Sequence, residues 1–154
     1  MPHFRRPKIS CEITSPLTRA AAEEGIVPGG GVAFLRAIDA VESAKRQAKA
    51  DEKLGFDIIA EALRSPARQI ADNAGEDGEV IVDEILQNNN PSYGYNAANG
   101  EFGDMFKLGI IDPTKVARTA LLNAASVSGL ALTTDVLVTE LKDKDENLVH
   151  GATK

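Results

Sequence analysis

The sequence lacks tryptophan, has one cysteine, and has few aromatic residues. Aromatic residues make up 5% of its 154 residues, whereas hydrophobic residues make up 43%. A folded core must therefore consist of Ala, Val, Ile and Leu, which favours helices packed closely through small side chains. Because Cys11 stands alone, a disulfide framework and a cysteine-based metal site are excluded. A reducing, cytoplasmic compartment is expected.

Basic residues are in the minority. The formal net charge is -6 and the pI is about 4.9, so the surface lacks the clustered Lys and Arg of a nucleic-acid interface. The local exception is the N-terminus, with Arg5, Arg6 and Lys8. No apolar run is long enough to span a membrane, and the N-terminal segment has no apolar region of the kind found in secretory signals. Neither nucleic acid nor membrane is an expected partner.

The sequence also lacks a recognisable catalytic constellation. His3 and His150 lie in the two terminal segments, away from any plausible core. No serine has a Gly-x-Ser-x-Gly context, and no nucleophile–base pair or metal-ligand cluster is apparent. The acidic pairs and runs, Glu23-Glu24 and 143–146, are most simply explained as solvated charge. An independent enzyme is the least expected function.

Three regions are expected along the chain. Residues 1–16 contain three prolines that interrupt any helical pattern, so this segment is expected to be irregular. Residues 17–141 form the folded part. Residues 142–154 are charged and are expected to be a flexible tail. No internal repeat is present.

The folded part is predicted to be all-α: mainly helical, with a small β-hairpin and a C-terminal strand. Helices are expected at 18–24, after the glycines at 29–31, at 54–63, 66–74 and 77–86, and from Asp112 to about 132. Gly25 should end the first helix, Ser65-Pro66 should begin a new one, and Asp77 can cap the helix at 77–86. Residues 26–28 are expected to be extended, because the residue before a proline avoids the α region. Asn99-Gly100 predicts a two-residue hairpin turn, and alternation at 134–141 predicts a strand. The Ala-rich helix after Asp112 is expected to be central.

Two motifs could approach a ligand, and each has a structural alternative. Gly29-Gly30-Gly31 exposes backbone N–H groups at a helix N-terminus, or it forms a tight turn that lets helices pack closely. It is not a Walker loop, because no Gly-Lys-Ser/Thr follows. Asn96 and its neighbouring amides could pair with a purine edge, with Ala97 and Ala98 leaving room for a flat ring. Alternatively, they are one arm of a hairpin.

Asp112 also has two candidate roles. It could cap the following helix, with Pro113 at the first helical position. It could instead accept hydrogen bonds from the hydroxyl groups of a ribose. The sequence alone favours capping.

Several motifs in a fixed order resemble the C-terminal half of the equatorial domain of group I chaperonins, the GroEL type. These motifs are Thr18–Ala33, Leu63–Ile70, Tyr93–Ala98, Ile111–Arg118 and Ala124–Leu130, followed by Thr133-Thr134. The resemblance extends almost continuously from Leu17 to about Leu141. It implies a partial chaperonin equatorial domain.

The resemblance also implies site residues. Gly30 would touch a nucleotide near the ribose, and Asn96, Ala97 and Ala98 would contact the adenine. Asp112 would hold the ribose. The ligand implied is ATP or ADP, and the 136–138 strand would lie at a subunit contact.

The chain departs from the family pattern in ways that bear on catalysis. The family's catalytic carboxylate would align near Ile13, where no acid is present. The phosphate-binding loop, the magnesium ligand and the apical domain have no counterpart in this sequence. The expected function is therefore that of a truncated chaperonin homologue, which supplies the adenosine side of an ATP site and packs with other subunits. On its own it is not expected to hydrolyse ATP.

Two alternatives remain open at this stage. The chain could be a non-catalytic module that associates with full-length chaperonin subunits, or a degenerate fragment without function. Both the truncated homologue and the non-catalytic module would have chaperonin subunits as partners. Unfolded protein would be bound only through a complete assembly.

Overall fold

The structure is a computed structural model that describes residues 11–136 and 138, with side chains from residue 16 onward. It divides into two compact units, Met1–Ala120 and Leu121–Lys154, and each is considered by itself. The site predicted from the sequence lies entirely in the first unit.

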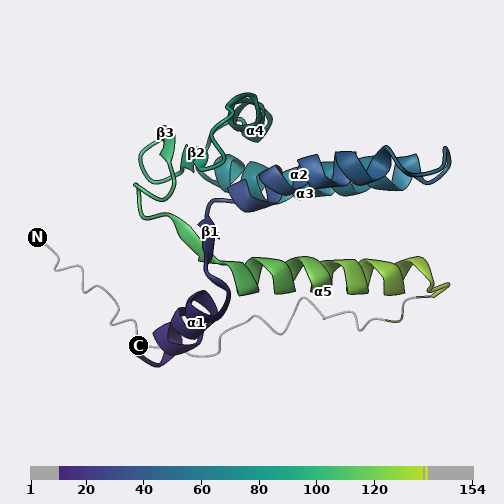
Figure 1. Cartoon of the computed structure of the whole chain (residues 1–154), viewed down its shortest axis with the longest axis horizontal. Helices are drawn as coiled ribbons and strands as arrows, with labels where there is room; N and C mark the ends of the chain where they lie inside the picture. Colours follow the sequence, from purple (N-terminus) through teal and green to yellow (C-terminus); the bar gives the residue numbers. More distant parts are fainter. Residues whose placement is uncertain (1–10, 137, 139–154) are drawn as a thin grey trace, which may run out of the picture. The chain divides into compact units, whose positions relative to one another are not determined.

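The expectation of a mainly helical fold with short β-hairpin elements is confirmed (Figure 1). The helices are α1 (Cys11–Glu24), α2 (Val32–Lys45), α3 (Lys53–Asn73), α4 (Gly78–Gln87) and α5 (Thr114–Leu132). The strands are β1 (Ile26–Pro28), β2 (Tyr93–Asn96), β3 (Glu101–Asp104) and β4 (Ile111–Pro113).

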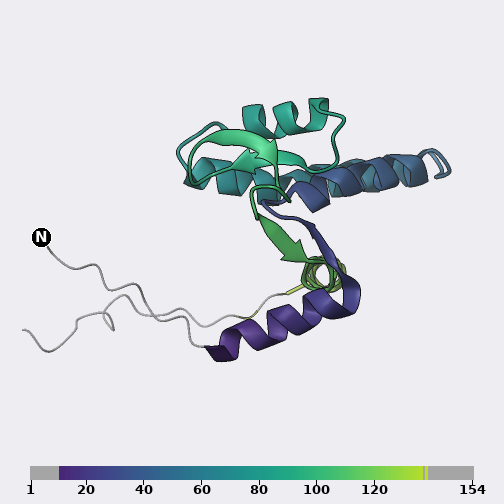
Figure 2. The ribbon, with the colours of Figure 1, turned by 60° about the vertical axis from the view of Figure 1, so that its left-hand side comes forward.

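The core of the first unit lies where α2, α3, α4 and β2 meet. Figures 1 and 2 both show α2 and α3 side by side along their lengths. The buried cluster comprises Val32, Leu35, Ala67, Ala71, Ile81, Val82, Ile85, Tyr95 and Met105. Small side chains on α3 let α2 approach closely, as the alanine-rich, aromatic-poor composition predicted.

Two helix ends follow local sequence signals. Gly25 ends α1 with a φ of 80°, and its N–H donates to the Ala21 oxygen over 2.9 Å. Asp77 caps α4, because its side chain accepts from the N–H of Glu79 at 3.0 Å and of Val80 at 3.4 Å. Both predictions are confirmed.

The strands form two short antiparallel ladders, one between distant parts of the chain and one within a hairpin. β1 pairs with β4, with Val27 opposite Asp112, and β2 pairs with β3, with Tyr95 opposite Phe102. The sequence predicted an extended segment at β1 but not its partner. The ladder between β1 and β4 brings the end of α1 to the start of α5, where the Thr114 N–H donates to the Gly25 oxygen over 3.1 Å.

Two prolines lie inside helices, contrary to prediction. α1 begins at Cys11 and includes Pro16, so residues 11–16 are helical rather than irregular. Pro66 lies within α3, which runs without the predicted restart. An internal proline removes one backbone hydrogen bond, and in α3 the buried Leu63 and Ala67 on either side anchor the helix to the core. Residues 1–10 lie outside the described part of the chain.

The hairpin loop contains four residues, not the predicted two. Asn96 pairs with Glu101, so residues 97–100 form the loop. The Asn96 oxygen accepts from the Gly100 N–H over 2.9 Å, and the Asn96 side chain accepts from the Ala98 N–H over 3.0 Å. These bonds close the loop at Asn96, two residues before the position that the Asn-Gly pair predicted.

The region after β4 also differs from prediction. α5 begins at Thr114, and Asp112 belongs to β4, so Asp112 does not serve as its cap. Pairing of Asp112 with Val27 holds its backbone in the ladder, and the helix begins at Thr114, one residue after the predicted first helical position.

The burial of the Ala-rich helix differs from that expected of a central helix. α5 has no buried residue, and Leu122, Val127 and Leu130 are 57%, 67% and 69% exposed. The C-terminal strand predicted at 134–141 is absent from residues 134–136 and 138; residue 137 and residues 139–141 lie outside the described part.

Candidate functional site

The glycine loop, residues 29–31, lies directly before α2 and allows close helix packing at Gly31. Gly31 has a φ of 79°, and a Cβ atom added there would lie 2.7 Å from the backbone nitrogen of Ala67. Only glycine allows α2 to approach α3 at this point. The structural alternative for this motif therefore holds at Gly31.

Gly30 occupies a different environment. Its φ is 65°, and an added Cβ would lie 3.6 Å from the Tyr95 oxygen and 3.8 Å from the Met105 sulfur. These are ordinary contact distances, so its surroundings do not exclude a side chain, although its backbone conformation disfavours one. Gly30 thus lies beside the end of β2, one residue from Asn96.

β2 is held close to the start of α2 by a second tight approach. A Cβ added at Gly94 would lie 2.5 Å from Val32 and 2.9 Å from Met105. Met105 is fully buried, and its N–H donates to the Ser92 oxygen over 2.8 Å. The hairpin is therefore fixed against the glycine loop by the core itself.

Asn96 organises the loop that follows β2. Its side-chain oxygen and its backbone oxygen accept the hydrogen bonds that close residues 97–100. Within the described residues, its side-chain nitrogen has no hydrogen-bond acceptor. Ala97 and Ala98 are exposed. The loop thus presents one amide donor beside two small side chains.

Asp112 reaches the same neighbourhood through β4. The Gly29 N–H donates to the Ile110 oxygen over 3.0 Å, which ties the glycine loop to the residues just before β4. Asp112 is exposed, and its carboxylate has no hydrogen-bond or ion-pair partner among the described residues. A carboxylate in this state can accept hydrogen bonds from hydroxyl groups.

The predicted residues therefore come from three segments that meet at the glycine loop. A Cβ added at Gly30 would lie 3.6 Å from the Tyr95 oxygen, next to Asn96, while the Gly29 N–H donates to the Ile110 oxygen, two residues before Asp112. The bond between Gly29 and Ile110 joins backbone atoms, so it orients these two segments whatever their side chains do. No sequence pattern indicated that these segments would meet.

An Arg on α2 fixes the segment that leads into the hairpin. The Arg36 guanidinium donates to the Ile85 oxygen at 3.0 Å and to the Asn90 oxygen at 2.8 Å. Its Nε atom is buried without a partner among the described residues. Arg36 therefore connects the last turn of α4 and the loop before β2 to α2, a role that sequence analysis missed.

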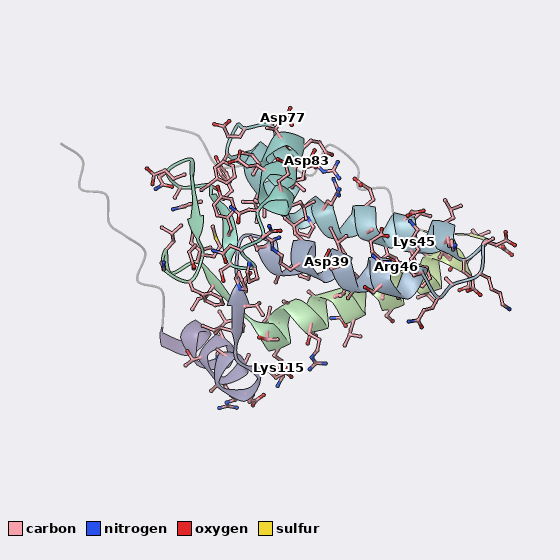
Figure 3. All side chains as sticks on the ribbon, turned by 45° about the horizontal axis from the view of Figure 1, so that its top comes forward. Asp39, Lys45, Arg46, Asp77, Asp83 and Lys115 are labelled. Atoms are coloured by element: carbon pink, nitrogen blue, oxygen red, sulfur yellow. The ribbon has the colours of Figure 1, made fainter. Side chains whose placement is uncertain are left out.

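Ion pairs close the junction between α1 and α5. Glu23 accepts from Lys115 at 2.5 Å, and both carboxylate oxygens of Glu24 accept from Arg118, at 2.6 and 3.1 Å. Figure 3 shows Lys115 near the start of α5. The expectation that Glu23-Glu24 is merely solvated charge is therefore wrong, although all four side chains remain partly exposed.

Shifted pKa values occur away from the candidate site. The hydrogen bond from Arg118 lowers the pKa of Glu24, and the same bond raises the pKa of Arg118. The hydrogen bond to Asp57 raises the pKa of Lys45, at the opposite end of α2. Burial, with Glu84 nearby, raises the pKa of Tyr93. These shifts have structural causes and do not mark an acid–base pair.

The described residues of the candidate site supply hydrogen-bond donors and acceptors. No group of three His, Cys, Asp or Glu side chains capable of holding a metal ion occurs among them. Across the same residues, no helix is both long and apolar enough to cross a membrane. The Asn96 amide nitrogen can donate a hydrogen bond, and the Asp112 carboxylate can accept one.

Comparisons with known proteins identify the family. The sequence matches the TCP-1/cpn60 chaperonin family over residues 14–142. The fold is similar to a group III chaperonin in its open state, with a TM-score of 0.71 and 35% identity over 77% of this chain. It is also similar to an open-state monomer of a group II chaperonin from Methanococcoides burtonii, with a TM-score of 0.69 and 27% identity over 75% of this chain.

These matches cover only part of each relative. The chain corresponds to 25% of the group III chain and 30% of the group II chain. The matched structures come from groups III and II, so they support the wider family rather than group I in particular. The chain belongs to the TCP-1/cpn60 chaperonin family.

Proposed function

We propose that this chain supplies the adenosine side of an ATP site within a chaperonin assembly. The observation that carries the proposal is the convergence of Gly30, the Asn96 loop and Asp112 on the glycine loop. The free Asn96 amide nitrogen would donate to the purine edge, and Ala97 and Ala98 would leave room for the ring. The Asp112 carboxylate would accept from the ribose hydroxyls.

The phosphate and magnesium side of the site would come from chaperonin segments outside this sequence. No described cluster here could hold magnesium. ATP hydrolysis requires groups that stabilise charge on the transferred phosphoryl group. The chain would therefore bind nucleotide weakly by itself and would depend on other segments, or on other subunits, for hydrolysis and for protein folding. The motif resemblance supports a group I type of assembly.

Calorimetric titration tests nucleotide binding. The purified chain is titrated with ADP and with Mg-ATP, together with Asp112→Ala. Loss of a hydrogen bond to a charged acceptor is expected to weaken binding about tenfold. Asp39→Ala is the matched control, because Asp39 is an exposed carboxylate on α2 that also lacks a side-chain partner among the described residues (Figure 3). No binding by the folded wild-type chain would refute autonomous nucleotide binding.

A second role, association with chaperonin subunits, is favoured by α5. Apolar side chains on this helix are exposed, including Leu122, Val127 and Leu130. Exposed apolar surface of this kind is typical of an interaction face. Leu122→Glu and Val127→Glu should abolish co-purification with full-length chaperonin subunits without changing the circular dichroism of the chain. Unchanged co-purification would contradict this role, and failure of the wild-type chain to associate would favour a degenerate fragment.

A further inference from the structure

The hairpin loop contains a chemically labile peptide. Of the eight asparagines in the sequence, only Asn99 is followed by glycine. Asparagine is a thermolabile residue, and a following glycine offers no side chain to shield its backbone nitrogen. Asn99 and Gly100 are both exposed, and no atom outside Gly100 and its two chain neighbours lies within 4 Å of the position that a Gly100 Cβ would occupy. The geometry around this pair then decides how readily it reacts.

The native loop holds both reacting groups in hydrogen bonds. The Gly100 N–H donates to the Asn96 oxygen over 2.9 Å. The Asn99 side-chain nitrogen donates to the Glu101 carboxylate over 2.7 Å, and the Asn99 side-chain oxygen accepts from the Glu101 N–H over 3.2 Å. The nitrogen that would attack and the amide that would be attacked are therefore both restrained while the hairpin is closed.

We propose that Asn99 is a spontaneous deamidation site whose rate is set by opening of the hairpin between β2 and β3. The Gly100 backbone nitrogen loses its proton to hydroxide and attacks Cγ of Asn99. A bond forms between that nitrogen and Cγ, and the bond from Cγ to Nδ2 breaks. Nδ2 leaves as ammonia after taking a proton from water, which produces a five-membered succinimide.

Water then opens the succinimide. Attack at the side-chain carbonyl gives aspartate, and attack at the main-chain carbonyl gives isoaspartate. The net change consumes one water and releases one ammonia, with no oxidant or reductant. Aspartate places a second carboxylate where the Asn99 amide donated to Glu101, and like charges at this separation repel. In isoaspartate the main chain runs through Cγ and the new carboxylate stands on Cα, so the side-chain amide that bonded to Glu101 is also lost. The reaction therefore removes a contact that keeps the loop closed.

Peptide mapping by mass spectrometry tests the proposal on the full chain. Samples are incubated at physiological pH and temperature, either native or unfolded in urea, and isoaspartate is detected with an isoaspartyl methyltransferase. Asn99 should be modified before any other asparagine in both samples. The native chain should react at least about fivefold more slowly, the factor that one hydrogen bond of ordinary net strength provides. Asn99→Gln should give no product at this position.

Substitutions of Glu101 test whether its bond to the Asn99 amide slows deamidation. Glu101→Ala removes the acceptor of the Asn99 amide, so deamidation of the native chain should accelerate about fivefold. In urea its rate should equal that of the wild type, which separates opening of the hairpin from a sequence effect. Glu101→Gln retains an acceptor oxygen and should accelerate the reaction less. Equal rates for native and unfolded wild type, an unchanged native rate in Glu101→Ala, or earlier modification of another asparagine would each overturn the proposal.

Discussion

Gly31→Ala tests the close approach of α2 and α3. The added methyl group would lie 2.7 Å from the nitrogen, 2.8 Å from Cα and 3.0 Å from Cβ of Ala67. Two of these three atoms belong to the backbone, so a side-chain rotation cannot relieve the overlap. Overpacking of this kind costs about 1–3 kcal/mol. The left-handed conformation of Gly31 adds about 1–2 kcal/mol for a residue with a side chain.

The two terms together give a loss of about 2–5 kcal/mol in the free energy of unfolding. This is a large fraction of the roughly 5–15 kcal/mol that stabilises a typical domain. Urea unfolding followed by far-UV circular dichroism measures it. Gly25→Ala is the matched control, since Gly25 has a φ of 80° and nothing within 4 Å of its Cβ position. Gly25→Ala should lower the free energy of unfolding only by the cost of the left-handed backbone conformation, about 1–2 kcal/mol.

A further variant separates backbone from side-chain overlap. Ala67→Gly removes the contact at 3.0 Å but leaves the two backbone contacts. Combined with Gly31→Ala, it should therefore not restore stability. The reasoning fails if Gly31→Ala costs no more than Gly25→Ala, or if Ala67→Gly rescues it.

Three other predictions concern caps, buried donors and ion pairs. Asp77→Ala should lower the free energy of unfolding by about 1 kcal/mol, measured by urea unfolding, because α4 loses its cap, whereas Asp77→Asn should cost less. Arg36→Met should lower the free energy of unfolding by about 1.5–3 kcal/mol, because two carbonyl oxygens lose a charged donor. Arg46 is exposed, so Arg46→Met should change the free energy of unfolding by less than about 0.5 kcal/mol. Glu24 has a lowered pKa in the folded state, so its stabilising effect is present above its unfolded pKa and is lost as the pH falls through its folded pKa. In Arg118→Met, an NMR titration should show the pKa of Glu24 rising toward its ordinary value, and an unchanged pKa would exclude the ion pair as its cause.

Local signals were sufficient to predict several elements. Gly25, the glycines before α2, and Asp77 each act within a few residues of the helix end that they define. The mainly helical class followed from composition and periodicity. These predictions succeeded because the physical cause and its effect lie within one turn of chain.

The errors arose where distant contacts outweigh local preference. Pro66 does not interrupt α3, because buried residues on both sides hold the helix against the core. Asp112 does not cap α5, because pairing with Val27 keeps it in a strand. Both contacts join residues far apart in sequence, which no local pattern encodes.

In the candidate site, too, local motifs were predicted from the sequence and long-range contacts were not. Gly30, Asn96 and Asp112 were identified from motif resemblance, and their roles toward a nucleotide remain predictions. The position of Gly30 beside Tyr95 and the Arg36 bonds that hold the loop before β2 had no signal in the sequence. Glu24 and Arg118 lie 94 residues apart, so their ion pair had no sequence signal either.

The proposed adenosine-side role is tested most directly by an NMR titration of the isotope-labelled chain with ADP. We predict saturable shifts confined to the amide signals of Gly30, Asn96, Ala97, Ala98 and Asp112 and their immediate neighbours, with signals at the far end of α2 and α3 unchanged. Absence of shifts in a folded chain, or shifts located elsewhere, would contradict the account.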